Sequence, residues 1–255
     1  MERRFVGKVA LVTGATSGIG QATAVRLAAE GALVAVNRRP DLDADQTLSL
    51  IKAAGGEGFD IAADMRDPAA VKAMVQEAAR RGGRLDYVVS NAAINPSLTW
   101  DATTVAAFDE LFDINVRGAW VACTEGARQM IAEGHGGAIV MVSSISAHVG
   151  APTQVAYCGT KGAISMLGKA LGAVLGKHGI RVNVVEPGAV ATNMSAELLS
   201  DPVALKYYEE RIALGRVGKP AELAASIAFF LSDDASYVTS STLLVDAGFI
   251  VNAEL

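Results

Sequence analysis

The stretch KVALVTGATSGIGQ at residues 8–21 decides the fold, because an apolar, Val-rich run leads directly into a glycine-rich turn. A short run that is apolar on consecutive residues is typical of a strand buried on both faces of a sheet. Gly14, Gly18 and Gly20 permit a tight turn and a close approach of the backbone to a phosphate at the start of a helix. This order of strand, turn and helix predicts the first unit of a dinucleotide-binding α/β fold.

The same alternation of apolar runs and helical segments continues to the end of the chain. Strands are expected at residues 8–14, 32–37, 58–64, 85–91, 137–144, 180–188 and 241–248. Helices are expected near residues 18–30, 44–54, 68–81, 104–133, 155–177 and 220–231. Strands that alternate with helices imply right-handed crossovers. We therefore expect residues 1–255 to form one doubly wound Rossmann-type α/β domain, with a parallel seven-stranded sheet and helices on both faces.

Two sequence details refine this expectation. Asp67-Pro68 and Lys219-Pro220 are typical of helix starts, where proline occupies the first turn. Residues 189–215 contain no clear strand, so we expect helices there, lying over one end of the sheet as a lid.

The composition excludes several classes of protein. Hydrophobic residues make up 51% of the chain and charged residues 19%, which indicates a well-packed globular protein. The net charge of -5 argues against a nucleic-acid surface. No apolar stretch is long enough to span a membrane, and the N-terminus has no signal-peptide core. Cys123 and Cys158 lack metal-ligand spacing, so we expect no metal site, free thiols and a cytoplasmic location.

The residues after the second strand indicate which dinucleotide binds. A carboxylate there would bind the adenosine ribose of NAD, but this strand ends in VNRRP. Arginines suit a phosphate dianion, so we expect NADP, with NAD also possible. The alternative is that both arginines are loop residues facing water. The predicted dinucleotide contacts in the first half of the chain are Gly14, Thr16, Ser17, Gly18, Ile19, Gly20, Asn37, Arg38, Arg39, Asp64, Met65, Asn91, Ala92 and Ala93.

A phenol and an ammonium group are spaced for a shared face on the helix that follows the fifth strand. Tyr157 and Lys161 are four positions apart, and helical residues at this spacing point the same way. A phenol has an ordinary pKa of about 10, and a neighbouring positive charge lowers the pKa of such a group. Ser144 ends the fifth strand, at the edge of the sheet where parallel folds bind ligands. We therefore expect Lys161, together with the positive nicotinamide ring of a bound dinucleotide, to prepare the Tyr157 phenol for proton transfer near neutral pH.

The ordered set of motifs resembles the short-chain dehydrogenase/reductase family. The motifs that carry the resemblance are Thr13-Gly14-x3-Gly18-x-Gly20, Asn91-Ala92-Ala93, Asn115, Ser144, Tyr157-x3-Lys161 and Pro187-Gly188. The family more often has glycine where this chain has Ala93. The resemblance implies that Tyr157 is the general acid/base, that Lys161 also holds the nicotinamide ribose, and that Ser144 binds the substrate oxygen.

Further roles follow from the same resemblance. Asn115 would hold a water molecule that relays protons from Lys161. Val190 and Thr192 would hold the nicotinamide carboxamide beside the Pro187-Gly188 turn. The substrate contacts implied by family position are Asn95, Ser144, Ser146, His148, Gln154, Tyr157 and Asn193, with Glu186 and Met194 also lining the pocket. For His148, an ordinary loop position is the equal alternative.

Most of these substrate contacts are hydrogen-bonding side chains, which suits a sugar or polyol better than a steroid or a long acyl chain. The end of the chain also resembles bacterial sugar 1-dehydrogenases of the family. We therefore expect oxidation of a sugar hydroxyl, at the anomeric carbon, to a lactone. A 3-oxoacyl-thioester reductase is the alternative enzyme, and a non-catalytic NADP-sensing regulator is the alternative from another class. The resemblance also implies a homotetramer, formed through helices 104–133 and 155–177 and the C-terminal segment.

Overall fold

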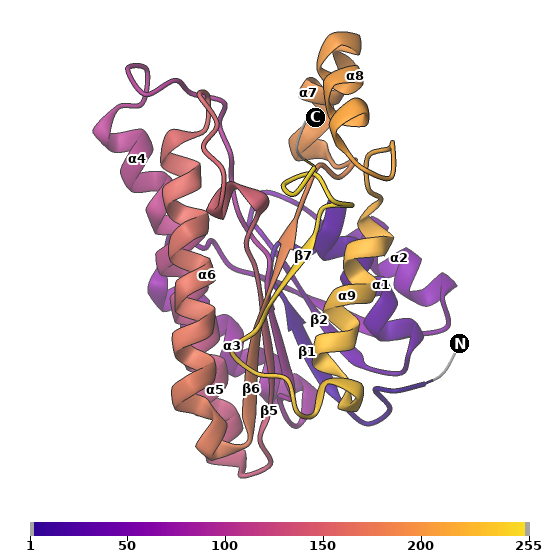
Figure 1. The fold of residues 1–255 in the computed structure, drawn as a ribbon. Helices are drawn as coiled ribbons and strands as arrows, with labels where there is room; N and C mark the ends of the chain where they lie inside the picture. Colours follow the sequence, from indigo (N-terminus) through magenta and orange to yellow (C-terminus); the bar gives the residue numbers. More distant parts are fainter. Residues whose placement is uncertain (1–2, 253–255) are drawn as a thin grey trace.

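The computed structural model describes residues 3–252, and its central element is one parallel sheet (Figure 1). The strand order is β3-β2-β1-β4-β5-β6-β7, so the order reverses between β1 and β4. The strands are β1 Val9–Val12, β2 Leu33–Arg38, β3 Glu57–Ala62, β4 Tyr87–Ser90, β5 Gly137–Val142, β6 Ile180–Pro187 and β7 Thr242–Val245. All seven expected strands are present, and the prediction of a parallel, doubly wound sheet is confirmed.

Helices cover both faces of the sheet, as predicted. The helices are α1 Gly18–Ala29, α2 Asp45–Ala53, α3 Pro68–Gly82, α4 Val105–Phe112, α5 Ala119–Glu133, α6 Val155–Leu175, α7 Ala196–Ser200, α8 Pro202–Arg211 and α9 Pro220–Leu231. In Figure 1, α1, α2 and α9 lie on one side of the sheet, and α3, α5 and α6 lie on the other. Two apolar cores result, one beneath each layer, and the strands contribute alternate side chains to each.

The helix starts follow from local chemistry. The Asp67 carboxylate accepts hydrogen bonds from the amides of Ala69 and Ala70, and Pro68 occupies the first turn of α3. Glu222 accepts a hydrogen bond from the Lys219 amide at the start of α9. Both predicted starts are therefore confirmed.

The segment expected as one helix over 104–133 is interrupted by a π-helical turn. Asp113–Gly118 forms this turn between α4 and α5. The wider turn places the buried Asn115 against the loop that follows β4. Such π turns occur frequently at functional sites.

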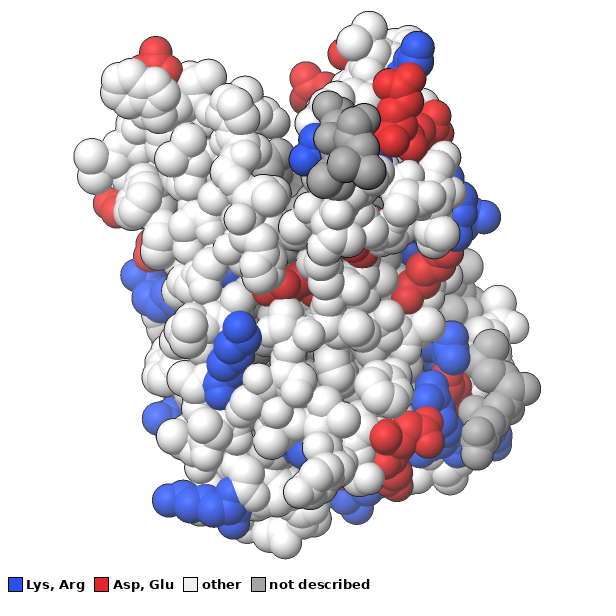
Figure 2. Space-filling view, viewed as in Figure 1, with Lys and Arg blue, Asp and Glu red and all other residues white. Residues whose placement is uncertain are grey.

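Two segments project beyond the carboxyl ends of the strands. The loop after β4 and α4 form one projection, and α7 and α8, within the expected helical region 189–215, form the other (Figure 1). Figure 2 shows that the surface is hollowed between them. Residues 253–255, the end of the segment expected at a subunit interface, lie outside the described range. No helix within residues 3–252 has the length and apolar character needed to cross a membrane.

Candidate active site

The site lies at the carboxyl edge of the sheet, where the strand order reverses between β1 and β4. The hydroxyl of Thr13, just after β1, accepts hydrogen bonds from the amides of Asn91 and Ala92 at 3.0 Å each. The Asn91 side chain donates in return to the carbonyls of Thr13 and Gly14. The segment from Asn91 to Ala93 is thus held against the glycine turn. Parallel sheets bind ligands at such a switch point.

The glycine turn has the shape of a phosphate cradle. Gly14 has φ +61°, and a Cβ there would lie 2.8 Å from the Cα of Ala92. Gly18 has φ +56°, and any Cβ on Gly20 would overlap the Gly14 carbonyl. Ser17 precedes α1 without a side-chain cap, and the first turn of α1 carries no acidic residue. The helix N-terminus therefore offers its amides to an anion, and these residues fit the pyrophosphate of a dinucleotide.

At the end of β2, Asn37 has a structural role, and Arg38 and Arg39 provide two cationic side chains. Asn37 is buried, its side chain accepts from the Gly14 amide at 3.1 Å, and it donates to the Ala63 carbonyl. The Asn37 amide group thus supports the glycine turn, and its predicted contact with the dinucleotide stays a prediction. Arg38 bonds Asp60 at 2.7 Å, and Arg39 forms two 2.6 Å bonds with Asp41.

The residues after β3 lie beside this region. Asp64 is paired with Arg66 at 2.6 Å, and this guanidinium holds the pKa of the Asp64 carboxyl below its usual range. Met65 is buried and packs against Gly118 of the π turn. Asp64 therefore keeps an ionised carboxylate at the strand end, whereas the Met65 side chain belongs to the core.

Tyr157, Lys161 and Ser144 come together between β5 and α6. Tyr157 and Lys161 are both buried, and the Lys161 Nζ lies 5.4 Å from the centroid of the Tyr157 ring. The Lys161 ammonium donates to the Val142 carbonyl at 3.0 Å, which fixes it under the end of β5. Ser144 lies near enough to Tyr157 to lower the pKa of its phenol. The predicted cluster therefore exists in the fold.

Burial is the main influence on the pKa values of Tyr157 and Lys161 in the protein on its own. Burial raises the pKa of Tyr157, although Ser144 lowers it in part. Burial also lowers the pKa of Lys161 to about 8. In the protein on its own, loss of solvation outweighs the effect of an ammonium that is bonded elsewhere. That Lys161 and the positive nicotinamide ring together favour phenolate stays a prediction. A further positive charge at the site is needed to favour phenolate.

Asn115 joins the two sides of this cluster. Its side-chain oxygen accepts from the Ile94 amide at 2.8 Å, and its nitrogen donates to the Ile94 carbonyl and to the Thr160 hydroxyl. Thr160 in turn donates to the Tyr157 carbonyl at 2.7 Å. Asn115 thus connects the loop after β4 to the first turns of α6. The predicted proton-relay role stays a prediction.

The turn after β6 is held by contacts that the sequence did not indicate. Gly188 packs against Asp246, where a Cβ would lie 2.7 Å from the Asp246 Cα. Val190 is buried, and its carbonyl accepts a hydrogen bond from the Ser195 hydroxyl. The Thr192 side chain contacts Ser195 at 3.2 Å and lies 3.3 Å from the Cβ position of Gly18. The Pro187-Gly188 turn and the glycine turn therefore face each other across the cradle.

The predicted substrate contacts lie on the segments that follow β4, β5 and β6. The Asn95 side-chain oxygen is buried and has no hydrogen-bond partner among residues 3–252, as expected of a group that meets a ligand. Ser146 bonds Ser144, and Gln154 pairs with Leu98 across the mouth. Asn193 and Met194 are exposed at the base of the second projection. These side chains are polar for the most part.

Glu186 differs from the prediction, because it does not line an open pocket. It is 1% exposed, and its carboxylate bonds His148 and Ser165. Ser165 was not predicted, although it stands one turn beyond Lys161 on the same face of α6. In the part of the chain that the structure describes, no group of three or more His, Cys, Asp or Glu side chains is placed to hold a metal ion.

Matches to known proteins extend over nearly the whole chain. A family model described as enoyl-(acyl carrier protein) reductase matches residues 14–250. L-rhamnose 1-dehydrogenase (NAD(P)(+)) of Sphingomonas sp. (strain SKA58) is 41% identical over 97% of this chain and 98% of that protein. A short-chain type dehydrogenase/reductase from Mycobacterium marinum is 34% identical, with a TM-score of 0.91 and 97% of each chain covered.

A second solved structure adds a bound dinucleotide to the comparison. Gluconate 5-dehydrogenase from Burkholderia cenocepacia J2315, in complex with NADP and tartrate, is 30% identical to this chain. The TM-score is 0.93, and the match covers 99% of this chain and 98% of that one. The likeness therefore extends over every strand end described above.

Proposed function

Because the chain belongs to the short-chain dehydrogenase/reductase family, we propose that it is an NAD(P)-dependent dehydrogenase that oxidises a hydroxyl group of a sugar. The observation that carries the proposal is the cluster of Tyr157, Ser144 and Lys161 beside a phosphate cradle. The side chains predicted to contact the substrate are polar for the most part, which supports a sugar. The Sphingomonas relative is named for L-rhamnose and for position 1, which supports an aldose as substrate and its anomeric carbon as the reacting carbon. L-rhamnose is the first candidate, and the product would be a lactone.

The residues have distinct parts in this proposal. NADP, or NAD, accepts the hydride when it is bound. Tyr157 takes the proton of the substrate hydroxyl, and Ser144 donates a hydrogen bond to the oxygen as negative charge develops. Lys161 supplies a cation beneath the ribose site, and Asn115 holds the surrounding segments in place. Arg38 and Arg39 would meet the adenosine 2′-phosphate of NADP.

The alternative of a 3-oxoacyl-thioester reductase is less well supported. An acyl-carrier partner would favour basic residues at the mouth of the site. The projection formed by α7 and α8, residues 196–211, carries Glu197, Asp201, Glu209 and Glu210 against two basic residues. Acidic side chains gather on this projection in Figure 2. The charge at the mouth therefore favours a small neutral substrate over an acyl-carrier protein.

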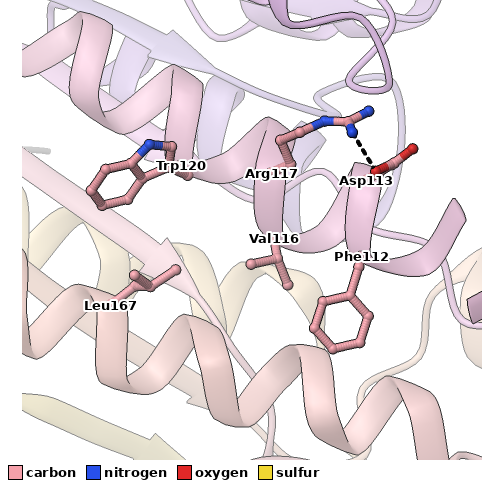
Figure 3. Close-up of a pocket in the computed structure, with 6 residues that line it drawn as sticks. All are labelled: Phe112, Asp113, Val116, Arg117, Trp120 and Leu167. Atoms are coloured by element: carbon pink, nitrogen blue, oxygen red, sulfur yellow. Dashed lines mark ion pairs between the residues drawn. The ribbon is translucent and has the colours of Figure 1, made fainter. Parts of the chain in front are cut away.

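We also propose that the chain forms a homotetramer through α5 and α6. Figure 3 shows a groove on their outer side, with Phe112, Val116 and Leu167 directed into it and the Arg117–Asp113 ion pair at its rim. Trp120 on this face is 43% exposed. An exposed apolar face of this kind is typical of a subunit interface.

The continuous sheet further supports one domain over residues 1–255. A cytoplasmic location stays a prediction.

The enzymatic proposal is tested with purified protein, a panel of aldoses and polyols that includes L-rhamnose, and NADP+ or NAD+. We expect cofactor reduction with an aldose, and a loss of roughly 10²–10⁴-fold in turnover for Tyr157→Phe with nucleotide binding retained. Reduction of a 3-oxoacyl ester without any oxidation of sugars would favour the alternative enzyme. Nucleotide binding without turnover on either class of substrate would favour a regulatory protein.

A further inference from the structure

Glu186 is a buried carboxylate without a Lys or Arg partner among the described residues. It lies near the end of β6 and is 1% exposed. One carboxylate oxygen, Oε2, is 2.5 Å from the His148 Nε2, and the other, Oε1, is 2.5 Å from the Ser165 Oγ. A buried carboxylate is costly unless it is hydrogen-bonded on both oxygens. His148 and Ser165 together meet this requirement.

The contact with Glu186 fixes the orientation of the His148 ring. The tautomer with its hydrogen on Nε2 donates to Glu186 Oε2 and leaves Nδ1 as an acceptor. The other ring nitrogen, Nδ1, has no partner among residues 3–252, and the side chain is 46% exposed. Ser165 is held in turn, since its hydroxyl lies 2.8 Å from the Ser143 Oγ and Ser143 donates to the Lys161 carbonyl. The imidazole is therefore placed by a network that ends on α6.

The position of this ring relates it to the substrate. His148 follows Ser144 by four residues at the end of β5, and Glu186 stands on the neighbouring strand β6. Both lie at the edge of the sheet where Ser144 and Tyr157 meet. A ring that presents one unpartnered nitrogen there is suited to a second hydroxyl of the same substrate molecule.

We propose that His148 binds a hydroxyl group of the sugar other than the one oxidised, and that Glu186 is the positioning residue that holds it. This proposal rests on the proposed sugar dehydrogenase function and adds to it a determinant of substrate choice. The pair favours a polyhydroxylated substrate over a simple secondary alcohol, because only the former offers a second hydroxyl to the imidazole. Glu186 acts through His148 and does not touch the substrate.

Two substitutions at His148 separate the roles of the two ring nitrogens. In His148→Gln the amide reaches the position of Nε2 and keeps the contact with Glu186, but the group at Nδ1 is lost. In His148→Asn the amide lies at the position of Nδ1, and Glu186 loses its partner. Both variants are compared with the wild type in thermal unfolding and in steady-state kinetics on the preferred aldose. Cyclohexanol serves as the substrate that lacks a second hydroxyl.

For His148→Gln we expect a KM for the aldose raised by roughly 10-fold, which corresponds to one lost hydrogen bond, with kcat and the melting temperature little changed. Its kinetics with cyclohexanol should equal those of the wild type. For His148→Asn we expect a lower melting temperature and a smaller rise in KM. Single-deoxy analogues of the aldose identify the contacted hydroxyl. For the analogue that lacks this hydroxyl, the ratio of the KM of His148→Gln to the KM of the wild type should approach one.

The role of Glu186 is tested by Glu186→Ala and Glu186→Gln. We expect Glu186→Ala to raise the KM for the aldose without affecting cyclohexanol, and Glu186→Gln to restore much of the loss because its amide oxygen accepts from Nε2. Aldose oxidation that is unchanged by His148→Gln, or an equal loss on aldose and cyclohexanol, overturns this inference and leaves the proposed function standing. A wild-type protein that oxidises no aldose overturns the proposed function and this inference with it.

Discussion

The pKa values of single residues at the site are set by burial more than by neighbours in the sequence. Tyr157 and Lys161 have the i and i+4 spacing that brings a phenol and an ammonium onto one face, and the structure confirms that they lie close together. Their pKa values nevertheless move in the directions that loss of water dictates, upward for Tyr157 and down to about 8 for Lys161. The remaining group that lowers the pKa of Tyr157 is Ser144.

Ser144→Ala should therefore change both the rate and its dependence on pH. Loss of the Ser144 hydroxyl raises the pKa of Tyr157 further, so oxidation requires a more alkaline solution. We expect kcat to fall roughly 10²–10³-fold and the rising limb of the pH–rate profile to move upward by about one pH unit. Steady-state oxidation from pH 6 to 10 measures both. Ser236→Ala, at an exposed position, is the control, and an unshifted limb would contradict the role of Ser144.

Asp41→Asn should strengthen the binding of NADP. The carboxylate of Asp41 makes two hydrogen bonds to Arg39, and it competes there with an incoming 2′-phosphate. An exposed ion pair contributes little, so we expect only a two- to fivefold lower Kd for NADPH and no change for NADH, which has no 2′-phosphate. Equilibrium titration of nucleotide fluorescence measures both. Arg39→Ala is the matched variant in the opposite direction, and equal effects on both nucleotides would contradict this assignment.

The sequence predicted which residues occupy the strand ends, but not what each side chain does there. Asn37 lies at the end of β2 as expected, yet its side-chain amide bonds the Gly14 backbone and the Ala63 carbonyl. Glu186 was expected in the substrate pocket and is instead buried against His148 and Ser165. Contacts between residues far apart in the chain decide these roles, and no local spacing encodes them.

At the level of elements, the π turn Asp113–Gly118 shows the limit of periodicity. The apolar pattern over 104–133 predicts helix throughout this segment, but it does not indicate the π turn that separates α4 from α5. It does not show that Asn115 is directed at the β4 loop, which depends on the wider turn. By contrast, the start of α3 was predictable, since Asp67, Pro68 and the amides that Asp67 caps lie within four consecutive residues.

Asn115→Ala should loosen the connection between this turn and the site. The substitution leaves the Ile94 amide and carbonyl without their side-chain partners in a partly buried loop. We expect the free energy of unfolding to fall by about 1–3 kcal/mol and the KM for the nucleotide to rise. Chemical denaturation and nucleotide titration measure the two effects. Thr124→Ala, at a half-buried position on α5, is the control, and unchanged stability in Asn115→Ala would contradict the connecting role.

At the level of the whole molecule, the alternation of strands and helices was sufficient to predict a parallel sheet with two helical layers. It does not give the strand order, because pairing between β1 and β4 joins segments that lie far apart in sequence. That reversal of order is what places the glycine turn beside Asn91 and opens the hollow between the two projections (Figures 1 and 2). The site is thus a property of the complete sheet.

A charge introduced on the outer face of α5 and α6 should dissociate the proposed tetramer. Trp120 lines the groove in Figure 3, and Met166 on the adjacent helix is 64% exposed. A carboxylate buried at a subunit interface without a partner is costly, and large aromatic residues commonly dominate such interfaces. We expect the wild type to be tetrameric and Trp120→Glu to dissociate at micromolar concentration, as measured by light scattering coupled to size-exclusion chromatography.

The control for this prediction is Leu50→Glu, which places the same charge on α2, on the opposite helical layer, where Leu50 is 41% exposed. Leu50→Glu should leave the molar mass of the assembly at that of the wild type, because α2 is not part of the proposed interface. Circular dichroism of Trp120→Glu should match the wild type, since the residue is partly exposed and the two apolar cores do not depend on it. A wild-type chain that is monomeric at high concentration would contradict the tetramer. A tetramer that survives Trp120→Glu would place its interface elsewhere.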